Sequence, residues 1–203
     1  MNLPRGLGLA GLLAAGMAFP LAGQERPYRS GFWLENGVGT GTVRIGCSTC
    51  EDVTSAYGQS SYLRLGGSLS RRALLGFEVF SLLDDQFSVA GGDSSIVAEN
   101  VAISLIVMWY PWTSGVFFKG GAGLAVSEYV VTAPGGGESA ITSGVGSGVT
   151  FGAGFDVPIR NWLSVTANLG VYFTALGDLT VQGVLIDDVI ATLYNANFAI
   201  TIR

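Results

Sequence analysis

Two cysteines, Cys47 and Cys50, stand in a Cys-x-x-Cys spacing that could support redox chemistry, a zinc site or a structural disulfide. The surrounding residues lack the βαβ pattern in which redox pairs of this kind are normally found. A zinc site would need more ligands than a chain without histidine readily supplies. In an exported protein a disulfide is the default. The sequence therefore predicts that Cys47 and Cys50 form a small disulfide loop.

The other side chains that could act as acids, bases or nucleophiles do not form a recognisable catalytic set. The chain has no histidine, the most common general base, and the paired acids Asp84 and Asp85 have no nucleophile at a defined spacing. We therefore expect no enzymatic activity, no catalytic residue, no cofactor and no dedicated metal site. Binding of divalent cations remains open as an alternative, because carboxylate oxygens are suitable hard ligands. The acids in question are Glu51, Asp52, Asp84, Asp85, Asp93, Glu138, Asp178, Asp187 and Asp188.

The amino terminus is typical of a signal peptide. Arg5 is followed by an apolar or glycine-containing run from Leu7 to Phe19, which is short for a membrane helix. We predict a signal peptide over residues 1–23 and one domain over 24–203. Removing Arg5 from ten basic residues leaves nine against fifteen acidic residues, a formal charge of −6 that disfavours nucleic acid as a partner.

The remaining chain contains eight segments in which apolar residues recur at every second position, as strands with two unlike faces require. Leu163, Val165 and Ala167, for example, alternate with Ser164 and Thr166. Short breaks, such as Ser70 to Arg72, alternate along the chain with long polar segments. The expected strands are 32–45, 61–69, 73–82, 97–109, 116–131, 149–156, 163–173 and 197–203.

The composition indicates which face of these strands meets the surroundings. Mean hydropathy is +0.48 and only 12% of the residues are charged, yet the polar face is dominated by glycine, hydroxyl and amide groups. A soluble barrel would need a more highly charged outer face, so we expect the apolar face to contact lipid. Open edges in lipid leave backbone groups without partners. The predicted fold is therefore all-β, an eight-stranded antiparallel up-and-down transmembrane β-barrel; a soluble barrel is the alternative.

Four charged residues are expected on the inner face. If Ser70 to Arg72 form a three-residue turn, residues whose numbers sum to 142 face each other, which places Arg64 opposite Glu78. Glu35 on the preceding strand and Lys119 on the fifth strand are expected at about the same level along the barrel axis as Arg64 and Glu78. An eight-stranded barrel is narrow enough to be filled by its own side chains. Glu35, Arg64, Glu78 and Lys119 therefore form a predicted interior charge network; individually hydrated charges are the alternative.

The spacing of the breaks also predicts an orientation. Short turns face the periplasm in barrels of this type, so both termini should be periplasmic and the long loops, 46–60, 83–96, 132–144 and 175–194, should face outward. The tryptophans fall at the periplasmic ends of strands, where an interfacial aromatic girdle is expected. The predicted girdle consists of Trp33, Trp109, Trp112 and Trp162.

Several motifs resemble those of the small OmpA-like and OmpX-like outer-membrane β-barrel proteins across the mature chain. They are Leu63-Arg64-Leu65-Gly66-Gly67-Ser68-Leu69, Leu74-Leu75-Gly76-Phe77-Glu78, Gly120-Gly121-Ala122-Gly123 and Gly152-Ala153-Gly154-Phe155-Asp156. The resemblance implies the barrel fold and a location in the outer membrane of a diderm bacterium. Members of this family serve as anchors, adhesins or resistance factors, so it implies a structural or surface-interaction role.

A narrow pore for ions or small solutes is the alternative function, because the inner-face glycines at positions 37, 39, 41, 121, 123, 152 and 154 could leave space for water. The expected partners are outer-membrane lipids and, during biogenesis, the barrel-assembly machinery. The outer loops are available for an extracellular ligand that the sequence does not identify. We expect the protein to be a monomer.

Overall fold

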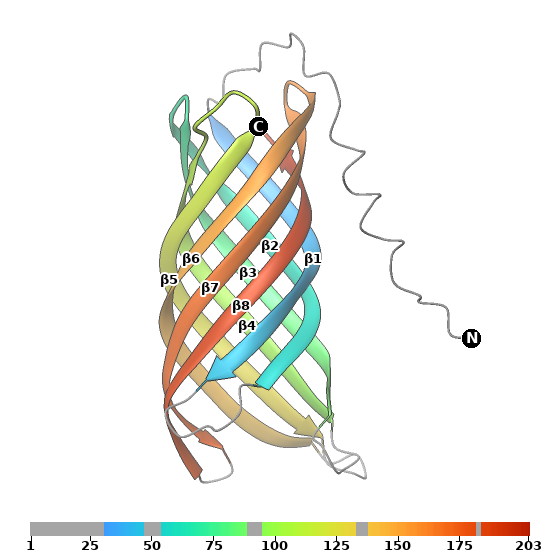
Figure 1. The fold of residues 1–203 in the computed structure, drawn as a ribbon, viewed down its shortest axis with the longest axis vertical. Coiled ribbons are helices and arrows are strands. Elements are labelled where there is room, and N and C mark those ends of the chain that lie inside the picture. The colour runs from blue at the N-terminus through green and yellow to red at the C-terminus, as the bar shows by residue number, and fades with distance from the viewer. Residues whose placement is uncertain (1–30, 47–53, 89–94, 133–137, 182–183) are drawn as a thin grey trace, which may run out of the picture.

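The computed structural model describes residues 31–46, 54–88, 95–132, 138–181 and 184–203 (Figure 1). These residues form a closed barrel in which each strand pairs with its neighbours in the sequence and the first pairs with the last. The fold class predicted from the alternation is confirmed. The strands are β1 (Phe32–Gly46), β2 (Thr54–Ser70), β3 (Ala73–Ser88), β4 (Ser95–Trp109), β5 (Val116–Thr132), β6 (Glu138–Arg160), β7 (Leu163–Val181) and β8 (Val184–Ile202).

The strands are longer than expected, and most of the difference lies at one end of the barrel. β6 has 23 residues and β8 has 19, so each extends well beyond the predicted segment. All four predicted long loops are partly strand, and the last one is almost entirely a hairpin that still pairs Val181 with Val184. An apolar outer face is needed only where a strand contacts lipid. Strand pairing continues past the predicted segments. In β8 both faces are apolar there, since Ile190 and Tyr194 are exposed while Ala191 and Leu193 are buried, so the alternation is lost.

The short turn after β2 has a different construction from the predicted one but produces the predicted register. Ser70 pairs with Ala73, which leaves Arg71 and Arg72 as a two-residue turn, and a bulge between Ser68 and Ser70 shifts the register. Beyond the bulge, the pairs have the expected sum of 142. We call the end of the barrel with these short connections the turn end, and the opposite end the loop end; in Figure 1 the turn end is at the top.

The outer wall is apolar and charged side chains lie inside, the reverse of a soluble protein. Phe151, Leu169 and Phe198 are 53%, 65% and 70% exposed, whereas Arg64 and Glu78 are buried. A wall of this type is suited to hydrocarbon rather than water. Within the described residues, no helix is long and apolar enough to cross a bilayer.

Two apolar clusters fill the interior on either side of a polar layer. The turn-end cluster consists of Trp33, Leu74, Ile106, Met108, Tyr110 and Phe117. The loop-end cluster consists of Val43, Tyr62, Phe80, Leu82, Ala102, Ala125, Tyr172, Leu176, Val189, Ala191, Leu193 and Ala199. The rings of Phe80 and Tyr172 stack in this cluster with centroids 4.3 Å apart. Glu35, Arg64, Glu78 and Lys119 lie between the two clusters.

Candidate functional site

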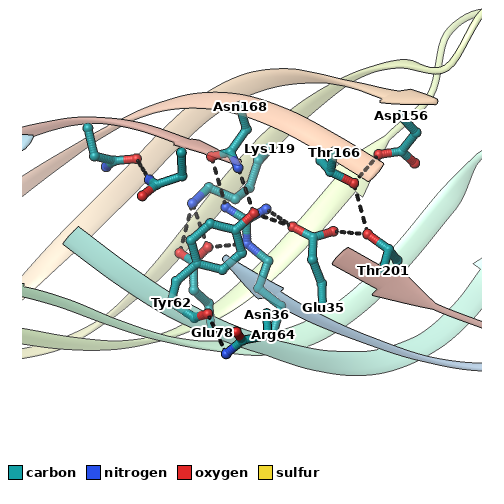
Figure 2. Close-up of polar contacts among 12 residues, drawn as sticks. Glu35, Asn36, Tyr62, Arg64, Glu78, Lys119, Asp156, Thr166, Asn168 and Thr201 are labelled. Atoms are coloured by element: carbon teal, nitrogen blue, oxygen red, sulfur yellow. Dashed lines mark hydrogen bonds and ion pairs between the residues drawn. The ribbon is translucent and has the colours of Figure 1, made fainter. Parts of the chain in front are cut away.

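The polar layer is organised around Arg64, which is buried on β2 (Figure 2). Strand register places Arg64 directly opposite Glu35 on β1 and Glu78 on β3, all with inward side chains. The Arg64 guanidinium donates through Nη1 to Glu35 Oε1 at 2.6 Å and through Nε to Glu78 Oε2. One cation therefore connects carboxylates from two neighbouring strands.

Lys119 reaches the same centre from the far side of the barrel. It extends from β5, and its Nζ lies 2.7 Å from both carboxylate oxygens of Glu78. The Tyr172 hydroxyl on β7 donates to Glu78 Oε1 at 2.6 Å. Glu78 therefore has two cations and a hydroxyl as partners. These contacts span the lumen, because β3, β5 and β7 are not neighbours in the sheet.

Glu35 is held by uncharged donors in addition to Arg64. Its Oε1 accepts from the Tyr62 hydroxyl at 2.6 Å, and its Oε2 accepts from the Thr201 hydroxyl at 3.0 Å. The Tyr62 hydroxyl in turn accepts from Asn168 Nδ2 at 2.6 Å, while the Tyr62 ring lies 3.9 Å from the Arg64 guanidinium carbon. The carboxylate is thus surrounded by donors.

The network continues toward the turn end through residues that were not part of the predicted charge network. The hydroxyls of Thr166 and Thr201 are 2.8 Å apart, and Thr166 donates to Asp156 Oδ1 at 2.9 Å (Figure 2). Arg203 Nη2 donates to Asp156 Oδ2 at 2.6 Å. Burial opposes the positive charge of Arg203, but the Asp156 carboxylate outweighs it and raises the pKa of the guanidinium. The alternation of apolar and polar residues predicts that these side chains point inward. It does not predict that they contact one another.

The resulting network is electrically balanced. Three acids, Glu35, Glu78 and Asp156, face three bases, Arg64, Lys119 and Arg203. The side chains of Glu35, Arg64, Glu78 and Lys119 are at most 2% exposed. Charges so far from water need this density of partners, because an unpaired buried charge costs several kcal/mol. The four predicted network residues therefore lie together, in one buried layer.

The inner glycines accommodate neighbouring groups rather than leaving open space. A Cβ on Gly37 would lie 2.4 Å from the Tyr62 ring, and one on Gly154 would lie 2.4 Å from the Phe117 ring. Leu82 similarly occupies the space beside Gly41. A cavity that includes Tyr172 in its lining measures about 10 Å³, the volume of one water molecule at most. The space expected beside Gly37, Gly41 and Gly154 is therefore filled by side chains, whereas the backbone of the neighbouring strand closes the space beside Gly39 and Gly123.

Three of the four predicted girdle tryptophans are on the outer wall. Trp109, Trp112 and Trp162 are 52%, 59% and 49% exposed at the turn end. The prediction is wrong for Trp33, which is 1% exposed and belongs to the turn-end cluster. The alternation contains the reason, since Trp33 is two residues from the inward Glu35 and shares its face.

Several predicted features lie outside the described residues. These include the signal peptide at 1–23 and both Cys47 and Cys50, so the disulfide stays a prediction. Side chains of most of the predicted outer acids, including Asp84 and Asp85, also lie outside the described set. Across the described part of the chain, no three His, Cys, Asp or Glu residues are grouped so that they could hold a metal ion.

Solved structures of other proteins share the barrel fold described above. No family model and no curated protein sequence matches the chain. Among solved structures, Neisserial surface protein A matches with a TM-score of 0.56 and 16% identity over 86% of this chain and 97% of that one. The attachment invasion locus protein Ail of Yersinia pestis matches with a TM-score of 0.53 and 12% identity, over 85% and 99% of the two chains. The chain therefore has the fold of the small eight-stranded outer-membrane β-barrels.

Proposed function

We propose that the protein is an integral barrel of a diderm outer membrane that has a structural or surface-interaction role, without transport or catalysis. In this assignment the turn end and both termini face the periplasm, and the loop end faces outward. The exposed apolar wall supports a location in lipid. The exposed tryptophans at the turn end support a membrane interface at that level.

The observation that carries the proposal is the filled interior. Arg64, Glu78 and Lys119 join strands across the lumen, and an apolar cluster lies on each side of them. A solute would have to disrupt paired charges and two layers of packed side chains. A rigid, closed barrel leaves the loop end as the surface that is available for function.

A narrow pore is the competing function, and the geometry does not favour it. Conduction needs a wet path lined by polar groups. Here aromatic rings occupy the space beside Gly37 and Gly154, and Leu82 occupies the space beside Gly41. The buried carboxylates already have partners, because Glu35 and Glu78 each contact a cation and a tyrosine hydroxyl. Neither carboxylate is therefore available as a general base.

The similar structures support a surface role only as an analogy. Ail is named as an attachment invasion locus protein, which indicates that this fold can present an interacting surface. For the present chain, the expected contacts are outer-membrane lipids around the wall, the assembly machinery during insertion and an unidentified extracellular ligand at the loop end. Nucleic acid is disfavoured by the net charge of −5.

Orientation and transport can be tested together in cells. An epitope inserted at 133–137 should be labelled by antibody on intact cells, whereas the same epitope between Thr113 and Ser114 should be labelled only after permeabilisation. Both variants should remain in the outer-membrane fraction and migrate faster on gels before boiling, as closed barrels do. Entry of a chromogenic β-lactam should be the same with and without the protein, while a general porin increases it. Labelling of both sites on intact cells, or protein-dependent entry, would overturn the proposal.

A further inference from the structure

The outward face of β1 carries a positive charge near the loop end. Arg44 is exposed there, two residues before the strand ends at Gly46. Exposed acids lie near the loop end of other strands, namely Glu99 on β4, Glu128 on β5 and Asp188 on β8. Within the residues that the structure describes, the outward side chains between these charges and the short turns are uncharged. The charges therefore mark where the uncharged band of the wall ends, the level at which lipid head groups are expected.

Two tyrosines flank this cation on the strands beside β1, which are β2 and β8 (Figure 1). Register pairs Thr42, the preceding outward residue of β1, with Tyr57 on β2 and with Tyr194 on β8. The tyrosines are 73% and 42% exposed, and the guanidinium carbon of Arg44 lies 6.0 Å from the centre of the Tyr194 ring. Tyrosine is enriched where a protein crosses from hydrocarbon to head groups. A guanidinium and two phenols thus form a group of exposed donors at the loop-end border of the band.

The wall becomes less polar from this group toward the turn end. The next outward row contains Thr40 and Gln59, which pair with each other and are exposed. On β1 and β8 the following row is apolar, because Val38 and Phe198 pair there and are 55% and 70% exposed. The wall therefore presents charge first, then uncharged hydrogen-bonding groups, then hydrocarbon.

We infer that this part of the wall binds the phosphate of an anionic lipid in the leaflet at the loop end. We call it the β1 rim site; it consists of Arg44, Tyr57, Tyr194, Thr40 and Gln59. The inference rests on the proposed membrane location. A guanidinium can donate two parallel hydrogen bonds to phosphate oxygens, and the phenol hydroxyls are further donors. The ester or amide linkages that follow the phosphate in such a lipid come to the level of Thr40 and Gln59, which can donate to their carbonyls.

Charge and depth together select this occupant. A zwitterionic lipid brings its own cation, so it gains less from Arg44 than an anionic lipid does. Free phosphate could contact Arg44 but would leave Thr40 and Gln59 facing hydrocarbon, where polar groups without partners are costly. The rim of β4 and β5 provides the contrast, because Glu99 and Glu128 are paired directly opposite each other there. Two carboxylates repel the phosphate that the β1 rim site attracts.

Photolabelling in vesicles tests the site. Refolded protein is placed in phosphatidylcholine vesicles that contain a small fraction of photoreactive lipid, either phosphatidic acid or phosphatidylcholine, with identical chains and the diazirine close to the head group. Mass spectrometry of peptides then locates the label. Phosphatidic acid should label the β1 rim site about fivefold more than phosphatidylcholine does, the factor expected for one basic residue at an anionic surface. The rim at Glu99 and Glu128 is the matched control in the same molecule and should show no excess.

Substitution of the cation makes the test specific. Arg44→Gln should remove the excess, whereas Arg44→Lys keeps the charge and should retain part of it; the heat-dependent gel shift confirms that each variant is folded. An excess that persists in Arg44→Gln, or that is equal at the two rims, would overturn the site. Loss of the excess when soluble phosphate is added at constant ionic strength would also overturn it, because the occupant would then be a free anion. Absence of label from the whole outer wall with both lipids would contradict the membrane location itself, and the inference with it.

Discussion

Replacing Arg64 by methionine is expected to lower the free energy of unfolding by about 3 to 5 kcal/mol, the usual cost of removing one partner of a buried ion pair. Arg64 is the only cation that the structure's described residues place on Glu35, whereas Glu78 also contacts Lys119. The loss should therefore come mainly from Glu35. Urea titration of barrel refolded into vesicles measures it. Arg72→Met, in the exposed turn, is the control and should change stability by about 0.5 kcal/mol or less.

The choice of second mutation makes this prediction specific to the observed geometry. Adding Glu35→Gln to Arg64→Met removes the stranded charge and should recover about half of the lost stability. Adding Glu78→Gln instead should recover none, because it also leaves Lys119 without its carboxylate. If Arg64→Met were only about 1 kcal/mol less stable than wild type, as for a water-screened pair, the buried network would be wrong.

Gly123→Ala is expected to destabilise the barrel by about 2 to 3 kcal/mol or more, the upper range for overpacking. An added Cβ would lie 1.9 Å from the Ile103 carbonyl oxygen and 2.6 Å from the Ser104 Cα, both part of the β4 backbone. The clash cannot be relieved by rotating a side chain. β4 itself would have to move, and the strand pairing with it.

Gly120→Ala provides a matched control on the same strand. The nearest atom to an added Cβ is Phe151 Cδ1 at 4.0 Å, an ordinary contact. This variant should have wild-type stability or slightly more, because alanine reduces the freedom of the unfolded chain. Both proteins are compared by urea titration and by the fraction that shows the heat-dependent gel shift. Equal stability of the two variants would contradict the close approach of β4 and β5.

The sequence was sufficient to predict the barrel, its register near the turn end and the position of the four central charges. Apolar alternation reports strand faces wherever one side meets lipid. A turn fixes the register of its hairpin. The predicted three-residue turn was wrong, but Arg64 still pairs with Glu78 because the bulge between Ser68 and Ser70 offsets the shorter, two-residue turn. The missed part of β8 has apolar residues on both faces, because Ile190 and Tyr194 are exposed while Ala191 and Leu193 are buried, so the alternation that marks a strand is lost there.

The site was incompletely predicted for a different reason. The inward positions of Tyr62, Asn168 and Thr201 follow from alternation, but their contacts depend on the strand tilt and closure of the barrel. The prediction for Trp33 failed because it was placed in the girdle by its position near a strand end. The alternation along β1 instead predicts that its side chain points inward, as observed. The rings beside Gly37 and Gly154 belong to Tyr62 and Phe117, their register partners on the neighbouring strands, so this filling depends on the strand register.

The central claim, a lumen closed by its own side chains, is tested most directly by planar-bilayer conductance of the purified wild-type protein. Folded protein, verified by its gel shift and by incorporation into vesicles, is fused with the bilayer in molar potassium chloride, with a general porin as the control for insertion. We predict no current steps above background at either polarity, because paired charges and two apolar clusters block the path. Reproducible ohmic steps that depend on the protein would contradict the account and establish a pore.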